Sequence, residues 1–219
     1  MTMWLLARAT GMVALIACTA SVAFGALAAS PKAPPLHDRM AFDDRMAFDD
    51  KMALGDTMDR RFLKQMAHRS AAVIGLALLL VHATLIIIDS FVNVSISGAL
   101  VPFTAGFRSL ALAAGTLSVY TFVAVAVSGA LRGRLATSAA SVRRWRYVHL
   151  SAYAGWALAM GHGIFAGTDT GAWWAMAVYV VCGVAVLVSV TVRLVAEMKH
   201  RSRPLPEARS RSFAGRRAS

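Results

Sequence analysis

The chain has 219 residues, 58% of them apolar, and a formal net charge of +12. A nucleic-acid-binding protein of this charge would gather its basic residues on one folded face, whereas here they lie between long apolar runs, so nucleic acid is excluded as a partner. The remaining polar stretches are too short to bury a hydrophobic core of their own, which excludes a sizeable soluble domain.

Five apolar runs predict membrane-spanning helices, because each is close to the roughly 20 residues that cross about 30 Å of hydrocarbon. They cover residues 8–29, 70–88, 110–131, 148–166 and 173–195. Two of them contain the cysteines Cys18 and Cys182, which we interpret as buried packing thiols and not as a disulfide or a metal pair. The predicted fold class is therefore all-α, an integral membrane bundle of about five transmembrane helices.

The first run imitates a secretory signal peptide, since Arg8 precedes an apolar stretch that ends in Ala26-Leu27-Ala28. The distribution of charge argues against cleavage. Of the 23 Lys and Arg residues, 21 lie within residues 32–69, 132–146 and 193–217, and the other two are Arg8 and Arg108. Because cytoplasmic loops collect Lys and Arg, we predict an uncleaved first helix in a multi-pass cell-membrane protein, with the N-terminus outside and the C-terminus inside.

Two polar segments are predicted to lie in the cytoplasm: a linker over residues 30–66 and a disordered basic tail over residues 197–219 that can reach anionic lipid. The linker contains a tandem hexapeptide, RMAFDD at 39–44 and 45–50, followed by an altered copy at 51–56. Its Met and Asp residues could bind a metal, but a period of six turns a helix about 240° beyond one turn, so no single face gathers them. We favour a duplicated, loosely ordered linker.

Four of the six histidines bracket the second and fourth apolar runs. His68 and His82 are 14 residues apart, a rotation of about 1400° that falls only about 40° short of four turns, so they share one helix face at two depths. Both runs cross in the same direction, which predicts that His68 meets His149 near the cytoplasmic side and His82 meets His162 near the outer side. Ionisable residues in membrane helices normally face a cavity or cofactor. Facing pairs of this kind suit bis-imidazole ligation of two haem irons.

The 13-residue spacing of the second pair is less regular, because a straight helix would turn His149 and His162 about 140° apart. Gly155, Gly161 and Gly163 would permit a kink or a local change of pitch, and His149 lies at the start of the helix. Hydrogen bonding between helices is the alternative use of these histidines.

The sequence resembles the ferric reductase-like transmembrane domain family, whose members include ferric-chelate reductases, NADPH oxidases and the haem-bearing membrane subunit of methionine sulfoxide reductase. The resemblance covers residues 4–195 and rests on the paired histidines and on the segments LARATG at 6–11, HRS at 68–70, LVPF at 100–103, WRYVH at 145–149 and HGIFAGTD at 162–169. It implies two b-type haems, the inner held by His68 and His149 and the outer by His82 and His162. Relatives usually continue into a flavin and pyridine-nucleotide domain. No Gly-x-Gly-x-x-Gly follows a strand-like run here, so no flavin or NAD site is expected.

Haem propionates are anionic, which makes arginines at the right depth candidate partners. Arg69 and Arg146 are candidates for the inner haem, although both serve equally well as topological anchors in cytoplasmic loops. Arg8 and Arg108 are candidates for the outer haem, and the family resemblance implies an arginine at the position of Arg8.

The expected function is transmembrane electron transfer by a di-haem subunit that takes electrons from a cytoplasmic flavoprotein or quinol and passes them to an external acceptor. It would be an oxidoreductase component without its own flavin domain. Trp145, Trp173 and Trp174 are interpreted as interfacial belt residues and not as electron relays. Two other functions stay open: a non-catalytic haem-binding or haem-sensing membrane protein, and a haem-free helical bundle.

Overall fold

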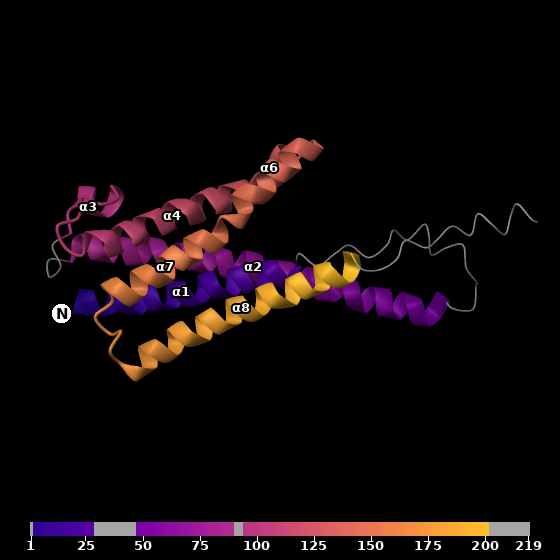
Figure 1. The fold of residues 1–219 in the computed structure, drawn as a ribbon, viewed down its shortest axis with the longest axis horizontal. Helices are drawn as coiled ribbons and strands as arrows, with labels where there is room; N and C mark the ends of the chain where they lie inside the picture. Colours follow the sequence, from indigo (N-terminus) through magenta and orange to yellow (C-terminus); the bar gives the residue numbers. More distant parts are fainter. Residues whose placement is uncertain (1, 29–46, 90–93, 202–219) are drawn as a thin grey trace, which may run out of the picture.

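The computed structural model describes residues 2–28, 47–89 and 94–201, with the backbone alone described at 47–58 and 200–201. All of the regular structure in these residues is helical (Figure 1). The elements are α1 (Thr2–Ala28), α2 (Ala47–Ile88), α3 (Ile96–Leu100), α4 (Ser109–Ala130), α5 (Arg132–Leu135), α6 (Ala139–Leu150), α7 (Ala152–Ala166) and α8 (Trp173–Arg201). The predicted all-α fold class is confirmed for the described chain.

Helix α1 lies at the centre of the bundle, among α2, α4, α7 and α8, which run along the long axis of the molecule (Figure 1). It packs along α2 and also contacts α7 and α8, while α4 packs along α7. The close approach of α1 and α2 depends on Gly75, where a Cβ atom would lie 3.0 Å from Sγ of Cys18. Cys18 and Cys182 are free and buried, as predicted. Helix α1 thus connects α2 and α7, two of the helices that carry the histidines.

Four helices of the described chain are long and apolar enough to cross a membrane. They are Thr2–Ala28, Asp59–Ile88, Ser109–Ala130 and Trp173–Lys199, and they match four of the five predicted spans to within one residue at their C-terminal ends or contain them. The remaining span, residues 148–166, falls on the end of α6 and on α7, which has only 15 residues. Figure 1 shows α6 and α7 following one another along nearly one line, with the break at Ser151. A fifth crossing therefore stays a prediction.

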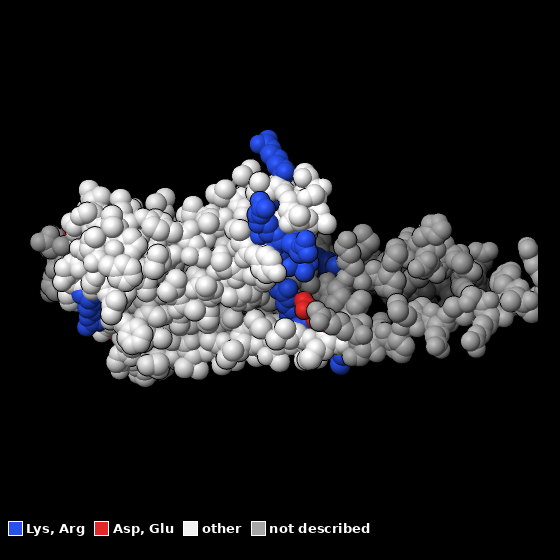
Figure 2. All heavy atoms as spheres, turned by 45° about the horizontal axis from the view of Figure 1, so that its top comes forward, with Lys and Arg blue, Asp and Glu red and all other residues white. Residues whose placement is uncertain are grey.

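Basic side chains gather at one end of the bundle, the end toward which α6 and the C-terminal part of α8 extend (Figure 2). Arg8 and Arg108, the two basic residues outside the three Lys- and Arg-rich segments, both lie near the opposite end, where α7 ends. Arg8 forms an ion pair with Asp169, and Nη1 of Arg108 donates to the backbone carbonyl of Phe165, 2.6 Å away. The uneven charge of the sequence is therefore also an uneven charge in space.

The predicted linker and tail are partly helical. Helix α2 begins at Ala47, so residues 47–66 continue the helix, and the expectation of a loosely ordered linker is wrong for this stretch. The search for apolar runs missed it because the segment is polar but rich in Ala, Met, Leu, Lys and Arg, which are good helix formers. Residues 39–46 of the hexapeptide repeat lie outside the described residues. Of the predicted tail, residues 197–201 belong to α8, and the remainder is also outside the described residues.

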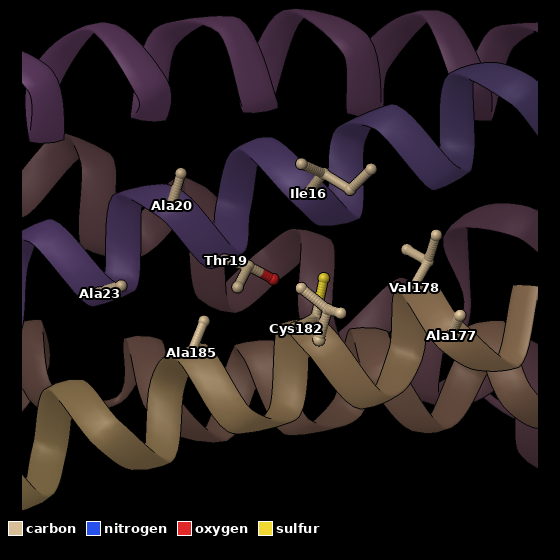
Figure 3. A pocket seen from close by; sticks show the side chains of 9 residues that line it. Ile16, Thr19, Ala20, Ala23, Ala177, Val178, Cys182 and Ala185 are labelled. Carbon is tan, nitrogen blue, oxygen red and sulfur yellow. The ribbon is translucent and has the colours of Figure 1, made fainter.

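A shallow apolar groove of about 390 Å³ lies between α1 and α8 (Figure 3). Small side chains line it, including Ala20, Ala23 and Ala185. Its one hydroxyl, on Thr19, donates to the carbonyl of Leu15 and accepts from Nε1 of Trp156. With that hydroxyl already engaged, the groove is not a candidate site for a polar ligand.

Candidate functional site

The four histidines that bracket the second and fourth apolar runs form two facing pairs. His68 of α2 faces His149 at the end of α6, with ring centres 6.1 Å apart and ring planes at 72°. His82 of α2 faces His162 of α7, with ring centres 6.3 Å apart and planes at 75°. The structure brings together the same partners that the sequence spacing predicts. We call them the inner pair, His68 and His149, and the outer pair, His82 and His162.

Three of the four rings use Nδ1 to bond a backbone carbonyl of a neighbouring helix. Nδ1 of His82 lies 2.7 Å from the carbonyl oxygen of Ala7, that of His162 lies 2.8 Å from Ala111, and that of His68 lies 2.8 Å from Ser21. A carbonyl can only accept, so Nδ1 carries the hydrogen and Nε2 keeps its lone pair. Histidine metal ligands are commonly oriented in this way, by the hydrogen bond of the second nitrogen.

His149 is held differently, by ring stacking. Its Nδ1 is buried, and the carbonyl of Val125 faces it without reaching hydrogen-bond geometry. The indole of Trp145 stacks on the imidazole, with centres 5.0 Å apart and planes at 19°. Trp145 is itself fixed, since Nε1 donates to the carbonyl of Ser128 at 2.9 Å and the guanidinium of Arg132 lies 4.7 Å from the ring centre. Trp145 is therefore more than an interfacial belt residue.

A glycine of an adjacent helix lies against each of the four rings. A Cβ atom at Gly11 would come within 2.8 Å of the His82 ring, and one at Gly25 within 3.1 Å of the His68 ring. On α4, the corresponding separations are 2.7 Å between Gly115 and His162 and 3.6 Å between Gly129 and His149. Each glycine thus lets a helix backbone approach an imidazole. Three of these positions have too little room for a side chain without movement of the ring.

The 13-residue spacing is accommodated at Ser151, between α6 and α7. The Ser151 amide is shared between the carbonyls of Tyr147 and Val148, each 3.2 Å away, which marks a locally tightened turn. Residues in a tightened turn rotate by about 120° and not about 100°, so three of them recover roughly 60° of the angular deficit of about 140°. The expected distortion therefore lies at the helix start and not at the glycines of α7. Gly155 and Gly163 instead allow close packing against Thr121 and Tyr179.

The geometry of both pairs fits two imidazoles on opposite sides of one metal ion. A metal–nitrogen bond of about 2.0 Å on each side, with roughly 1.2 Å from that nitrogen to the ring centre, places the ring centres about 6 Å apart. The Nε2 atoms make no hydrogen bond to described residues and are not sealed from surrounding space. No group of three or more His, Cys, Asp or Glu side chains gathers among the described residues. Two imidazoles would fill only two coordination positions of a six-coordinate metal ion. A porphyrin would supply the other four donors.

The four predicted propionate partners differ in their surroundings. Arg8 pairs with Asp169, while its buried Nε makes no hydrogen bond to a described residue. Arg108 caps the end of α7 through Phe165, as described above. Arg69 and Arg146 are exposed near the inner pair. None of the four has a described contact with a histidine ring, so their assignment to propionates stays a prediction.

Two kinds of residue at the site were absent from the candidates chosen from the sequence. One is the set of four glycines, whose signal was available: Gly11 and Gly25 are 14 residues apart, as are Gly115 and Gly129. The other is the stack of Arg132 on Trp145, which no spacing rule reveals. Comparison of the chain with protein-family models, curated proteins and solved structures finds no match.

Proposed function

We propose that this chain is a transmembrane electron-transfer subunit that holds two b-type haems, the inner between His68 and His149 and the outer between His82 and His162. Electrons enter from a cytoplasmic flavoprotein or quinol and leave to an acceptor outside the cell membrane. The single observation that carries the proposal is the repeated geometry of the two pairs: ring centres 6.1 Å and 6.3 Å apart, with a glycine of a neighbouring helix against every ring.

The alternative use of the histidines, hydrogen bonding between helices, accounts for only one nitrogen of His68, His82 and His162, and His149 makes no such bond to a described residue. The bonds from Nδ1 to the carbonyls of Ser21, Ala7 and Ala111 do join helices. They leave Nε2 without a hydrogen bond to described residues, a costly state in a membrane unless that nitrogen has another partner. In those three rings, a metal ligated at Nε2 would account for both nitrogens at once.

In this proposal the side chains hold and orient the cofactor, and the cofactor supplies the redox chemistry. A bound haem supplies reversible one-electron chemistry between ferric and ferrous iron. Nδ1–H bonds to backbone carbonyls hold three imidazoles in the tautomer that offers Nε2, and Trp145 holds the fourth by stacking. The glycines keep α1 and α4 close to the rings, so the apolar helices exclude water. Two imidazole ligands per iron favour electron transfer over binding of a further ligand at the metal.

The proposed orientation has the N-terminus outside, the C-terminus inside and five crossings, with α6 and α7 together making the fourth. Its support is the gathering of Lys and Arg at one end of the bundle (Figure 2) and the location of Arg8 and Arg108 near the other. The inner pair then lies near the basic end and the cytoplasm. The outer pair lies near Asp169 and the external face.

Haem binding is tested first, by the visible spectrum of the purified protein before and after dithionite. Reduced b-type bands from two haems per chain are expected, and a chain without them would be the haem-free bundle. Transfer is tested in sealed vesicles of known orientation, reduced from the cytoplasmic face with an impermeant ferric chelate on the other side. Reduction of the chelate is the expected result. Two haems without transfer, given a verified donor and acceptor, would favour the haem-sensing alternative.

A further inference from the structure

Helices α5 and α6 present a basic face at the end of the bundle where the inner pair lies. Five exposed arginines make up this arginine face: Arg132, Arg134, Arg143, Arg144 and Arg146. The sequence has no Asp or Glu between Asp89 and Asp169, and none of the five arginines has an ion pair with a described residue. Figure 2 shows basic side chains clustered at this end of the molecule. The face therefore carries a net positive charge that an acidic surface would complement.

This face is connected to the inner pair by a continuous series of ring contacts. The guanidinium of Arg132 lies 4.7 Å from the centre of the Trp145 ring, the indole stacks on His149 at 5.0 Å, and His149 faces His68 at 6.1 Å. No comparable stack joins a described arginine to the outer pair, since Arg8 and Arg108 bond to Asp169 and Phe165. A redox partner seated on the arginine face would thus lie next to His149, which would hold the inner haem.

The arginine face is also held in a fixed position. The hydrogen bond from Nε1 of Trp145 to Ser128 ties the end of α6 to the last turns of α4. Helix α6 begins with a capping box formed by Ser138 and Ser141, which orders its first turn. Figure 1 shows the start of α6 extending past the end of α4, and Arg143 and Arg144 are exposed on α6.

We propose that the arginine face of α5 and α6 is the docking site for an acidic redox protein. The inference rests on the proposed function. A haem held by His68 and His149 would accept electrons one at a time from a reduced flavin of the partner, the flavin being oxidised as ferric iron becomes ferrous; no bond is made or broken. An anionic lipid surface would also be attracted by these charges, but it gives no reason for the stack of Arg132, Trp145 and His149. Charge complementarity beside that stack favours a protein donor.

The test measures binding of flavodoxin, a small flavoprotein with one bound flavin, to the full-length haem-loaded chain in phosphatidylcholine nanodiscs. R143Q/R144Q removes two charges from the arginine face. R61Q/K64Q removes two charges from α2 at the same end of the bundle and is the matched control. We expect R143Q/R144Q to raise Kd about fivefold and to flatten its dependence on salt, with the control within about twofold, as for exposed interfacial charges. The rate of haem reduction by flavodoxin should fall in parallel.

Three outcomes would overturn the docking proposal: no binding by the unmodified chain, equal weakening in the control, or loss of binding when phosphatidylglycerol is added to the nanodiscs. The last would assign the face to anionic lipid. The dithionite-reduced spectrum of every sample separates these outcomes from failure of the proposed function. Chains that hold two haems but do not bind flavodoxin would contradict only the proposed docking site. Chains without haem would contradict the proposed electron-transfer function itself.

Discussion

At the scale of single residues, each histidine of the outer pair uses Nδ1 for a hydrogen bond to the protein, which leaves Nε2 for the proposed ligand. Nδ1 of His82 and of His162 donates to Ala7 and Ala111 on the packed neighbouring helices, so the ring cannot rotate without losing a hydrogen bond in an apolar setting. The imidazole planes are thereby fixed before any cofactor arrives. This preorganisation makes the pairing of the histidines a property that substitution can test.

The first prediction concerns that pairing. His68→Ala and His149→Ala should remove the same inner haem, and His82→Ala and His162→Ala the same outer one, with haem content falling by about half each time because each substitution removes one of the two protein ligands proposed for that haem. The measurement is the reduced-minus-oxidised spectrum and the haem-to-protein ratio of each variant. His37→Ala, outside the pairs, is the control. Spectroscopically different losses for His68→Ala and His149→Ala would contradict the pairing.

The second prediction concerns the glycines. Gly115→Ala should cost the outer haem, because its Cβ would lie 2.7 Å from Nδ1 of His162 and must displace that ring. Gly129→Ala should be tolerated, since its Cβ would be 3.6 Å from His149. Gly161→Ala is a close control, because nothing lies within 4 Å of the added atom although His162 is the next residue. Equal haem content in all three variants would show that the outer ring can move freely.

The sequence predicts the histidine pairs because a helix converts spacing into direction. Spacing alone does not identify the glycines, since the chain has 16 of them and the choice depends on which helices are neighbours. The role of Trp145 also depends on a tertiary detail, the rotation of α6 that places the indole on His149. In the sequence, Trp145 lies where an apolar run meets a polar loop, which favours its interpretation as an interfacial belt residue.

At the scale of elements, the break between α6 and α7 keeps both His149 and His162 directed at α2. The shared Ser151 amide and the bond from its hydroxyl to the carbonyl of Val148, at 2.6 Å, stabilise the tightened turn. Apolar runs predict where helices cross, but not such a turn, because a single turn leaves no periodic signal. Apolar runs do not reveal the start of α2 for a different reason: its first turns are polar and lie outside any apolar run.

The third prediction tests this turn by insertion. One alanine added between Ser151 and Ala152 would rotate α6 relative to α7 by about 100°. His149 should then leave the inner site, while His162 keeps its bond to Ala111. The expected spectrum has lost the inner haem and retained the outer one. An alanine inserted between Ala136 and Thr137, before α6, is the control and should retain both haems; retention of both in the first variant would mean that the turn is not needed.

At the scale of the whole molecule, the uneven distribution of Lys and Arg follows the long axis along which the helices pack. The basic end contains the arginine face, and the opposite end contains two arginines, one of them paired with Asp169. Sequence counting predicts this division because positive residues resist transfer across the membrane. It does not establish that α7 crosses, since 15 residues of helix rise only about 22 Å, less than the hydrocarbon thickness. The end of α6, continuing the line of α7, would supply the missing length.

The last prediction therefore tests the fourth crossing and the orientation together. Thr137 lies before α6 and Gly171 lies after α7, and both are exposed. In a background with Cys18 and Cys182 replaced by alanine, Thr137→Cys and Gly171→Cys are each treated in intact cells with a membrane-impermeant maleimide. Gly171→Cys should be labelled from outside and Thr137→Cys only after lysis, because α6 and α7 together separate a basic cytoplasmic loop from an external loop that lacks Lys and Arg. A cytoplasm-dependent reporter fused after Ser219 should be active in the same cells.

Labelling of both cysteines from one side would show that α6 and α7 do not cross the membrane. Labelling of Thr137→Cys alone would invert the predicted orientation and move the inner pair to the external face.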